Sequence, residues 1–313
     1  MNGHLPILSS STWQIGVLPE AGGTLAFGRV ETLAGRVDVF RPTPIAALRR
    51  PERTASYPLI PWSNRIGEGL LRFGNRTWQL RRNSDDGTAC HGTVLDYAWR
   101  VVTRRDESIE LILTSADLVG INFPWRFAAG ITYRLAGDRL LVDTWLSNGD
   151  DEPFPAGLGH HPYFMRHLRA GDGVARLQVP AEAGYALING MATGPAVPVA
   201  PRIDFRVSRP VGDRVVDDCL TGFDTFGARA TIAYDDLTLT LTCDPVYSHL
   251  VVFVPRDRAY FAVEPVTHVN GAHALLADGA AGTGLVVLEP GERMAAGFSL
   301  QAVQPADVQG SSR

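Results

Sequence analysis

The chain of 313 residues contains no lysine, so all 29 of its basic side chains are arginines. Its 33 acidic residues give a formal net charge of −4, and there is no basic field to attract nucleic acid or an anionic membrane. No apolar run approaches the roughly 18 residues that a membrane-spanning helix needs. The N-terminus lacks the basic region and apolar stretch of a signal peptide, and the sequence therefore predicts a cytoplasmic protein.

Cysteine is also scarce. Cys90, Cys219 and Cys243 are odd in number and widely spaced. This pattern is typical of a reduced cytoplasmic protein rather than of a disulfide framework or a zinc site. A Gly-x-Gly-x-x-Gly segment after a strand is likewise missing, which argues against a dinucleotide site.

Amphipathic helical patterns are few, and the best candidate is a short one at residues 270–276. Alternation of apolar and polar residues with a period of two dominates instead, which is typical of strands. We expect strands at residues 77–82, 139–147, 237–244, 249–255, 260–265 and 284–292. Many strands separated by Gly, Pro, Asp and Asn predict an all-β sandwich or barrel.

No sharp linker divides the chain. Residues 184–214 are rich in Gly and Pro and could form a joint, but strands of the same style flank them. We interpret this segment as a long loop in one large domain that spans residues 1–313. Residues 305–313 are predicted to form a flexible tail.

Glu264 is a polar residue in strand-like, apolar surroundings, where a charged group needs a reason. Alternation in YFAVE puts its side chain on the same face as Tyr260 and Ala262. We expect Pro265 to end the strand and leave the carboxylate at the strand end. A carboxylate sheltered by aromatic rings has a raised pKa and suits a general base, whereas an exposed edge glutamate would have no catalytic role.

Two histidines, His160 and His161, are neighbours in an extended segment, so their side chains point to opposite faces. Pro162 keeps that segment extended, and one histidine of the pair can share a face with Glu264. A histidine, with an ordinary pKa of about 6.5, suits proton donation near neutral pH. We expect His160 to have the structural role.

Asn64 and Arg65 lie in PWSNRIGEG, between aromatic and proline residues. An arginine in such a place is often part of a surface ion pair. The same combination of a planar donor and aromatic rings also binds sugars, whose hydroxyls accept hydrogen bonds and whose apolar face stacks on a ring.

Taken together, the polar motifs resemble the aldose 1-epimerase, or mutarotase, family and follow the same order along the chain. They are PWSNRIGEG, CHG, GLGHHPYF, DFRVSRPVGDRVVDD and FAVEPVTHVNGAH. The resemblance implies a single large antiparallel β-sandwich of the supersandwich kind, with a site in a groove on one sheet and with no cofactor or metal. It also implies an enzyme that interconverts the α and β anomers of an aldohexose monosaccharide. We expect the protein to be a monomer or homodimer.

The resemblance further implies residue roles. Glu264 matches the general base and His161 the general acid, which together would open the sugar ring. His91 matches a second catalytic histidine, which contacts the sugar near its ring oxygen. Arg65 and Asp217 match residues that bind sugar hydroxyls, with Asn64 beside them. Gly92, after His91, would allow backbone or substrate to approach closely.

The chain departs from the family pattern around the site. His160 stands where asparagine is frequent, and Pro162 where many members have a small polar residue. Pro-Val-Thr follows Glu264 in place of Thr-Gln of the galactose-converting branch. These differences leave the preferred sugar open.

Three alternatives remain at this point. The first is a metal-dependent hydrolase or cupin-like oxygenase in which His91, His161 and Glu264 would be the metal ligands. The second is a hexose-6-phosphate mutarotase, in which Arg49, Arg50 and Arg53 would bind the phosphate. The third is a noncatalytic carbohydrate-binding protein.

Overall fold

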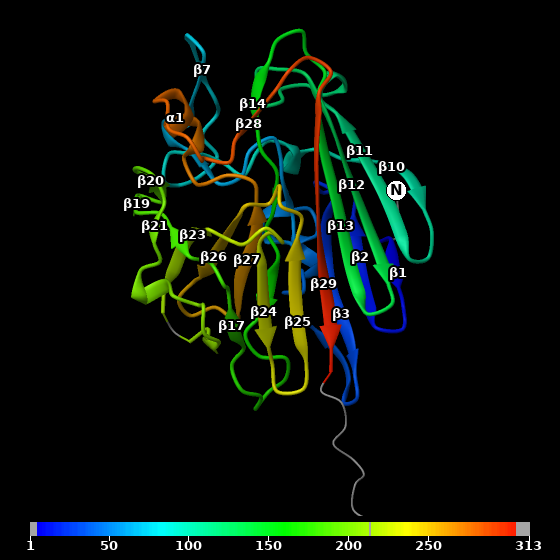
Figure 1. Ribbon diagram of the computed structural model, residues 1–313. Helices are drawn as coiled ribbons and strands as arrows, with labels where there is room; N and C mark the ends of the chain where they lie inside the picture. Colours follow the sequence, from blue (N-terminus) through cyan, green and yellow to red (C-terminus); the bar gives the residue numbers. More distant parts are fainter. Residues whose placement is uncertain (1–4, 213, 305–313) are drawn as a thin grey trace, which may run out of the picture.

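The computed structural model describes residues 5–212 and 214–304, so the predicted tail at residues 305–313 lies outside the described residues. Two large antiparallel sheets dominate the structure (Figure 1). The prediction of an all-β sandwich is confirmed. Among the described residues, no helix is long and apolar enough to cross a membrane.

The larger sheet has nine strands in the order β10-β11-β12-β13-β29-β25-β24-β17-β22. Their bounds are β10 Arg100–Arg104, β11 Ser108–Thr114, β12 Phe127–Ala136, β13 Arg139–Asn148, β17 Arg176–Gln178, β22 Arg209–Pro210, β24 Arg229–Ala233, β25 Thr238–Cys243 and β29 Arg293–Val303. The C-terminal strand β29 therefore lies in the middle of this sheet, between β13 and β25 (Figure 1).

The second sheet has eight strands, in the order β21-β18-β23-β26-β27-β15-β5, with β16 also paired to β27. Their bounds are β5 Pro58–Leu59, β15 Gly159–His160, β16 Tyr163–Met165, β18 Ala183–Gly184, β21 Val197–Pro198, β23 Val216–Thr221, β26 His249–Val254 and β27 Tyr260–Val266. Strands from distant parts of the chain thus meet on β27, which carries Glu264.

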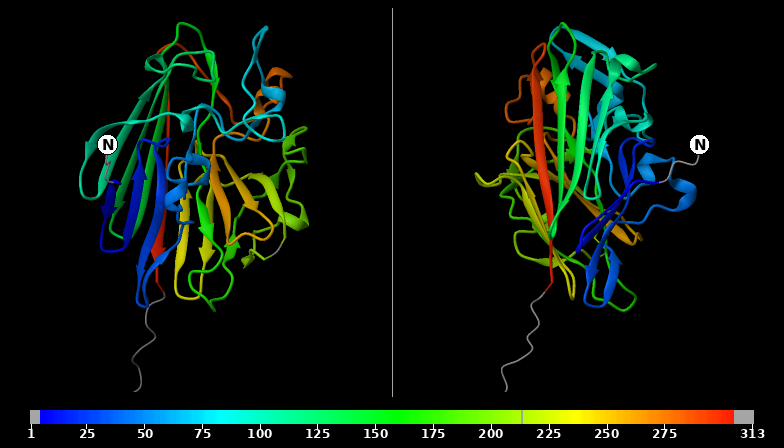
Figure 2. Two further views of the ribbon diagram at one scale, coloured as in Figure 1. Left: turned by 180° about the vertical axis from the view of Figure 1, so that it is seen from behind. Right: turned by 90° about the vertical axis from the view of Figure 1, so that its right-hand side faces the viewer.

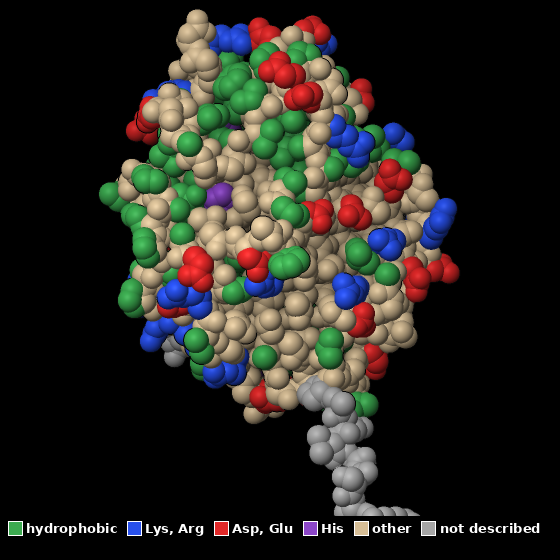
Figure 3. Space-filling model, viewed as in Figure 1, with side chains coloured by type: hydrophobic (Ala, Val, Ile, Leu, Met, Phe, Trp, Pro, Cys, Tyr) green, Lys and Arg blue, Asp and Glu red, His purple; other side chains and the backbone are tan. Residues whose placement is uncertain are grey.

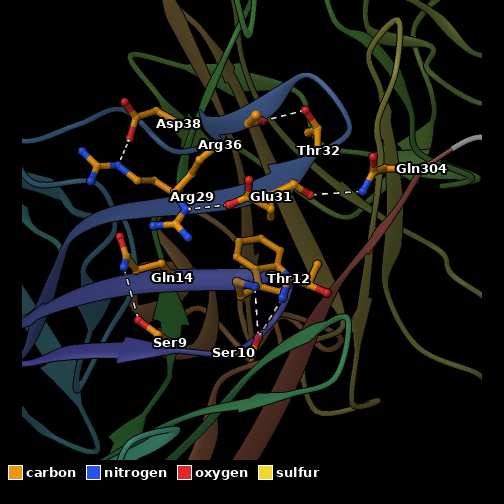
Figure 4. A network of polar contacts seen from close by, with 12 residues as sticks. Ser9, Ser10, Thr12, Gln14, Arg29, Glu31, Thr32, Arg36, Asp38 and Gln304 are labelled. Carbon is orange, nitrogen blue, oxygen red and sulfur yellow. Dashed lines mark hydrogen bonds and ion pairs between the residues drawn. The ribbon is translucent and has the colours of Figure 1, made fainter.

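The N-terminal strands form a separate four-stranded sheet, drawn in blue in both views of Figure 2. Its strands are β1 Ile7–Ser9, β2 Trp13–Leu18, β3 Thr24–Thr32 and β4 Gly35–Asp38. Cross-strand pairs brace its surface, among them Arg29 with Asp38 at 2.7 Å and Arg36 with Glu31 at 3.0 Å (Figure 4). Gln304, just after β29, donates to the carbonyl of Glu31 and ties the end of the chain to β3.

Short elements complete the structure. Among them are four two-stranded sheets: β6 Arg65–Ile66 with β9 Ala89–Cys90, β7 Leu70–Phe73 with β8 Arg76–Gln79, β14 Phe154–Ala156 with β28 Val286–Leu288, and β19 Leu187–Ile188 with β20 Met191–Ala192. The helix α1, Ala272–Ala277, falls where the sequence predicts it. Single 3₁₀ turns lie at residues 45–47, 51–53, 67–69, 94–96, 115–117 and 201–203.

One large hydrophobic cluster joins the three sheets, with buried side chains from the first strands to the last. In β13 the alternation of the sequence matches burial, since Leu140, Val142, Thr144 and Leu146 point inward. Leu250 and Val252 of β26 belong to the same cluster. Burial of apolar surface, worth about 25 cal/mol per Å², therefore holds the sheets together.

The structure corrects the prediction that Pro265 ends its strand. β27 continues to Val266, with Pro265 paired to Leu250. The amide of Thr267 donates to Leu158 on the other side of β27, and alternation turns the nitrogen of Pro265 to that same side. On that side β15 ends at His160 and β16 begins only at Tyr163. No strand residue there is placed to accept a hydrogen bond from residue 265, so the N–H that proline lacks costs the sheet no hydrogen bond.

The Gly- and Pro-rich segment at residues 184–214 is more structured than the predicted long loop. It contains the β19–β20 hairpin and contributes β21 and β22 to the edges of the two large sheets. The strands expected at 77–82 and 284–292 are shorter than predicted, at Arg76–Gln79 and Val286–Leu288.

Candidate active site

The candidate site lies on the outer face of the eight-stranded sheet. Val251 is paired with both Cys219 and Glu264, which puts the Glu264 carboxylate on the face that carries Val251. Asp217 shares this face because it is two residues from Cys219 on β23. A second hydrophobic cluster covers this face and includes Tyr57, Tyr163, Val251 and Ala262. Glu264 is consequently only 2% exposed.

His161 meets Glu264 on this face. The imidazole Nε2 lies 3.1 Å from the carboxylate Oε1, and both side chains are buried. The amide of His161 donates to the carbonyl of Tyr57, which fixes the backbone just beyond β15. The Oε2 atom of Glu264 and the Nδ1 atom of His161 are buried and have no hydrogen-bond partner within the described part of the chain. These two atoms are free to bind a ligand.

Aromatic rings surround the imidazole of His161. The ring centroid of Tyr57 is 4.8 Å away and that of Tyr163 is 4.3 Å away, and the two tyrosine hydroxyls are 3.3 Å apart. The guanidinium of Arg41 lies 3.8 Å from the centroid of Tyr163 and 4.6 Å from that of Tyr260. The packing holds the imidazole in one orientation and brings a positive charge behind it.

Burial moves the two pKa values in opposite directions. It raises the pKa of Glu264 well above 4.5, with the negative charge of Asp217 adding to the effect and Arg65 opposing it. Burial also lowers the pKa of His161 well below 6.5, helped by His91 and by the charge of Arg41. Both shifts resist changes in the number of protons on the pair, so the pair holds one proton over a wider pH range than two groups with ordinary pKa values would.

His91 lies next to this pair, with its ring centroid 5.5 Å from that of His161 and 5.9 Å from that of Tyr57. Its backbone is left-handed, with φ of 66°. Burial and the nearby charge of Arg65 lower its pKa to about 4, so its imidazole is neutral at pH 7. A β-carbon on Gly92 would lie 2.0 Å from the carbonyl oxygen of Ile60; the close approach expected at this glycine is that of the Ile60 backbone.

Arg65 is held by three partners. Its Nε donates to Asp86 at 2.8 Å, its Nη1 to the side-chain oxygen of Asn64 at 3.1 Å, and its Nη2 lies 3.5 Å from Asp217. Asn64, with φ of 54°, also accepts the amide of His91 at its carbonyl. The network fixes the guanidinium beside the acid–base pair and links it to the backbone of His91.

His160 and Asp218 are the sequence neighbours of His161 and Asp217, and the alternation of side chains along a strand turns both away from the site. His160 is fully buried between the sheets, where its Nε2 lies 2.7 Å from Thr144 Oγ1 and its ring packs on Phe298. Asp218 points away from Asp217 and pairs with Arg202 at 2.5 Å. The structure thus brings together the six sequence-predicted site residues: His91, His161, Glu264, Asn64, Arg65 and Asp217.

Three residues at the site escape the sequence argument: Asp86, Arg41 and Tyr57. Tyr163 belongs to the GLGHHPYF motif, but the sequence assigned it no role. Asp86 accepts hydrogen bonds from the amide and the hydroxyl of Thr88, an Asx turn that the letters NSDDGT indicate. Arg41 and Tyr57 come from segments with no motif around them, and only the fold places them here. Within the residues that the structure describes, no group of three or more His, Cys, Asp or Glu side chains is arranged to hold a metal ion.

A small patch of histidine surface is visible in Figure 3, at the height between α1 above and the strands β23 and β26 below. Of the site residues, Arg65 and Asp217 remain partly exposed, at 21% and 34% of their side chains. A small ligand would therefore meet these two polar groups before it reached the buried pair.

Known proteins share both the sequence pattern and the fold. The model of the aldose 1-epimerase family matches residues 17–301. The uncharacterised protein YphB of Escherichia coli K12 is 25% identical over 256 residues, 78% of this chain and 82% of YphB. A galactose mutarotase-like protein from Clostridium acetobutylicum superposes with a TM-score of 0.83 at 17% identity, covering 96% of this chain and 95% of that one. A GalM/aldose epimerase homologue from C. elegans gives 0.79 at 16%, covering 96% and 99%. The chain belongs to the aldose 1-epimerase family.

Proposed function

We propose that the protein interconverts the α and β anomers of an unphosphorylated aldohexose, with Glu264 as the general base and His161 as the general acid. The observation that carries this proposal is the buried contact of 3.1 Å between these two side chains. In a cyclic aldose the hydroxyl that loses a proton and the ring oxygen that gains one are both bonded to C1. Base and acid must therefore be close neighbours.

The reaction needs one proton on the pair and returns it. The shifted pKa values put the resting proton on Glu264, so the reactive form is the one in which this proton has crossed the 3.1 Å contact to His161. Glu264 then takes the proton of the C1 hydroxyl at its Oε2 atom while the bond between C1 and the ring oxygen breaks. His161 gives its proton to that oxygen, and the sugar becomes an open-chain aldehyde. After rotation about C1–C2, the same groups exchange roles and close the ring as the other anomer. Each positioned proton transfer contributes about 10²- to 10⁴-fold to the rate.

The neighbouring residues bind and orient the sugar in this proposal. His91 is neutral at pH 7 and has a buried Nδ1 without a partner among the described residues. It donates or accepts one hydrogen bond near the ring oxygen. Arg65 and Asp217 bind hydroxyls on the part of the sugar away from C1, and Asn64 and Asp86 hold Arg65 in place.

Charge favours an uncharged sugar over a hexose phosphate. Arg65 is already paired with Asp86 and Asp217, and two carboxylates at this position would repel a phosphate. The arginines first considered for a phosphate are Arg49, Arg50 and Arg53. They belong to the segment around the 3₁₀ turn at residues 51–53, and Arg53 lies 4.0 Å from Glu52. A noncatalytic binding protein would gain nothing from a buried imidazole–carboxylate contact, since burying such groups costs free energy.

Polarimetry tests the proposal directly. Freshly dissolved α-D-glucose and α-D-galactose are followed with and without the protein and beside the Glu264→Gln variant, which keeps the shape and removes the base. We expect the protein to speed the approach to anomeric equilibrium and the variant to lose at least about 10²-fold in kcat/KM. An unchanged rate in Glu264→Gln would overturn the assignment of the base. Failure with both sugars, followed by turnover of glucose 6-phosphate, would favour the phosphosugar reaction instead.

A further inference from the structure

His268 lies in the segment that follows β27 and is buried, with 1% of its surface exposed. It belongs to the motif FAVEPVTHVNGAH, but the proposed reaction gives it no role. Its imidazole reaches the turn that carries Asn64 and Arg65, where Nε2 lies 3.0 Å from the backbone nitrogen of Ser63. A side chain from the continuation of β27 thus contacts the backbone that presents the proposed sugar ligands.

The hydrogen bonds of His268 fix its protonation state. A backbone amide donates, so the Nε2 atom accepts from Ser63 and the proton is on Nδ1, which lies 2.9 Å from the carbonyl oxygen of Val269. Burial lowers the pKa of His268 to about 4, which keeps the ring neutral at pH 7. Both ring nitrogens are therefore occupied, and the imidazole holds the chain rather than a sugar.

The turn that His268 contacts has a backbone conformation that needs support. Asn64 has φ of 54°, in the left-handed region that residues other than glycine rarely adopt. Ser63 is fully buried, and a buried amide that loses its acceptor costs about 1–3 kcal/mol. The imidazole therefore favours this conformation of the turn over others in which the amide would reach solvent.

Two proposed sugar-facing residues depend on the same turn. The carbonyl of Asn64 accepts the amide of His91 at 2.9 Å, and the side-chain oxygen of Asn64 accepts from Nη1 of Arg65 at 3.1 Å. Glu264 is held separately, by the pairing of β27 with β26 and β16. A displaced turn would therefore move the imidazole and the guanidinium relative to the base.

The segment after β27 also holds Arg65 from a second side. The amide of Gly271 donates to the carbonyl of Arg65 at 3.1 Å, and the side chain of Asn270 donates to the carbonyl of Gly190 at 3.0 Å. A β-carbon on Gly190 would lie 2.9 Å from the Arg65 guanidinium carbon, so the β19–β20 hairpin packs directly on the arginine. His268 completes this support on the side of the turn.

A glycine leaves room for the imidazole of His268. A β-carbon on Gly157 would lie 2.1 Å from the Cδ2 atom of the ring, so the ring packs directly on the backbone there. The amide of Gly157 donates to the carbonyl of Pro61 at 2.7 Å, just before the turn. The backbone on which the ring rests is thus itself tied to the segment that the ring holds.

We propose that His268 is a positioning residue that, through the backbone of Ser63 and Asn64, holds Arg65 in place beside Glu264. The inference rests on the proposed function, in which Arg65 binds a hydroxyl of the sugar. A displaced guanidinium would bind the sugar and the transition state less well by similar amounts. The loss of His268 should therefore raise KM more than it lowers kcat.

Substitutions of similar length separate the acceptor from the bulk of the side chain. His268→Gln keeps an acceptor near the position of Nε2, whereas His268→Met removes it. His160→Met is the matched control, because it removes another buried imidazole whose Nε2 is hydrogen-bonded, 2.7 Å from Thr144 Oγ1 between the sheets. Polarimetry with glucose and galactose gives KM and kcat for each protein, and urea unfolding gives the stability.

We expect His268→Met to raise KM about tenfold and to lower kcat about threefold or less, with His268→Gln recovering most of the loss. His160→Met should lower the stability but leave KM within about twofold. If His268→Met does not fold, His268→Asn, whose shorter side chain does not reach the Ser63 amide, takes its place. An unchanged KM in the variant without the acceptor, or an equal rise in the control, would overturn the proposal.

Arg65→Ala identifies the route of the effect. If His268 acts through Arg65, the variant with both substitutions should have the KM of Arg65→Ala alone, because the displaced group is already absent. Increases in KM that add together would show that His268 does not act through the arginine and would also overturn the proposal.

A binding measurement separates this proposal from the proposed function. If neither sugar is turned over, the mutarotase proposal fails, and calorimetric titration with glucose and galactose then decides the role of His268 by itself. Weaker binding by His268→Met than by His268→Gln would support the role. Equal binding by these two variants, or no binding by the unsubstituted protein, would reject it.

Discussion

The two faces of the eight-stranded sheet differ sharply although the same strands form both. The inner face of β26 and β27 carries Leu250, Val252, Phe261 and Val263, all part of the large hydrophobic cluster. The outer face carries Glu264 among tyrosines and small apolar residues. One residue of displacement along a strand therefore decides whether a side chain stabilises the fold or meets a ligand.

His160 and His161 show this difference most directly. Burial lowers the pKa of both, to about 3 for His160, so burial alone does not distinguish them. Their partners do: His160 faces the hydroxyl of Thr144, whereas His161 faces a carboxylate. Only His161 therefore lies beside a second titratable group, so that a proton donor and a proton acceptor can meet a substrate together.

The largest effect on kcat/KM is expected when His161 and His160 are each replaced by asparagine and the two variants are compared. His161→Asn should lower kcat/KM for mutarotation by about 10²- to 10⁴-fold and leave the fold intact, because it removes the acid. His160→Asn should leave kcat/KM nearly unchanged and lower the free energy of unfolding by about 1–3 kcal/mol, since a buried hydrogen bond is disturbed. Polarimetry and urea unfolding measure the two quantities. If His160→Asn damages turnover as much as His161→Asn, the choice of acid is wrong.

A smaller effect is expected at the two aspartates of β23, which also point to opposite faces. Asp217→Asn keeps the shape, removes the charge beside Arg65 and should raise KM about tenfold, with kcat changed less. Asp218→Asn, which is paired with Arg202 instead, should leave both constants within about twofold. Steady-state kinetics on the two variants check this contrast, and equal KM values would exclude Asp217 as a sugar ligand.

The pH dependence should show the smallest effect, a plateau where ordinary pKa values predict a decline. With a histidine at 6.5 and a glutamate at 4.5, activity would fall as the pH rises above 6.5 and the acid loses its proton. Here the pKa of Glu264 is raised and that of His161 lowered, so the pair keeps its single proton above 6.5. On the acid side the pair takes its second proton on His161, and the lowered histidine pKa keeps that step well below 6.5.

We therefore expect kcat/KM, after subtraction of spontaneous mutarotation, to stay level between about pH 6 and pH 7.5. A profile that falls steeply through 6.5 would mean that His161 titrates as an ordinary histidine and that the contact with Glu264 does not hold the proton.

Much of the site could be inferred from sequence order and alternation. The period of two in residues 139–147 and 260–265 indicated strands, and it separated His160 from His161 and Asp217 from Asp218. It failed at Pro265, because a proline is tolerated inside a strand where the neighbouring strand is interrupted, and such an interruption is a property of the sheet.

Other parts of the site had no sequence signal. Arg41 and Tyr57 reach the site from segments that carry no motif, and the turn indicated at Asp86 does not reveal its contact with Arg65. The hairpin of residues 187–192 that borders Arg65 lies in a stretch expected to be a loop. These placements depend on contacts between residues far apart in the chain, which a local pattern does not encode.

The sequence by itself determined the all-β fold, the family and the residues that face the site, because alternation and motif order are local properties of the chain. The tertiary structure alone decided that Glu264 is buried against His161 and that burial moves their pKa values in opposite directions. Burial and distance depend on how the sheets, hairpins and helix pack together, and it is this packing that joins the base to the acid.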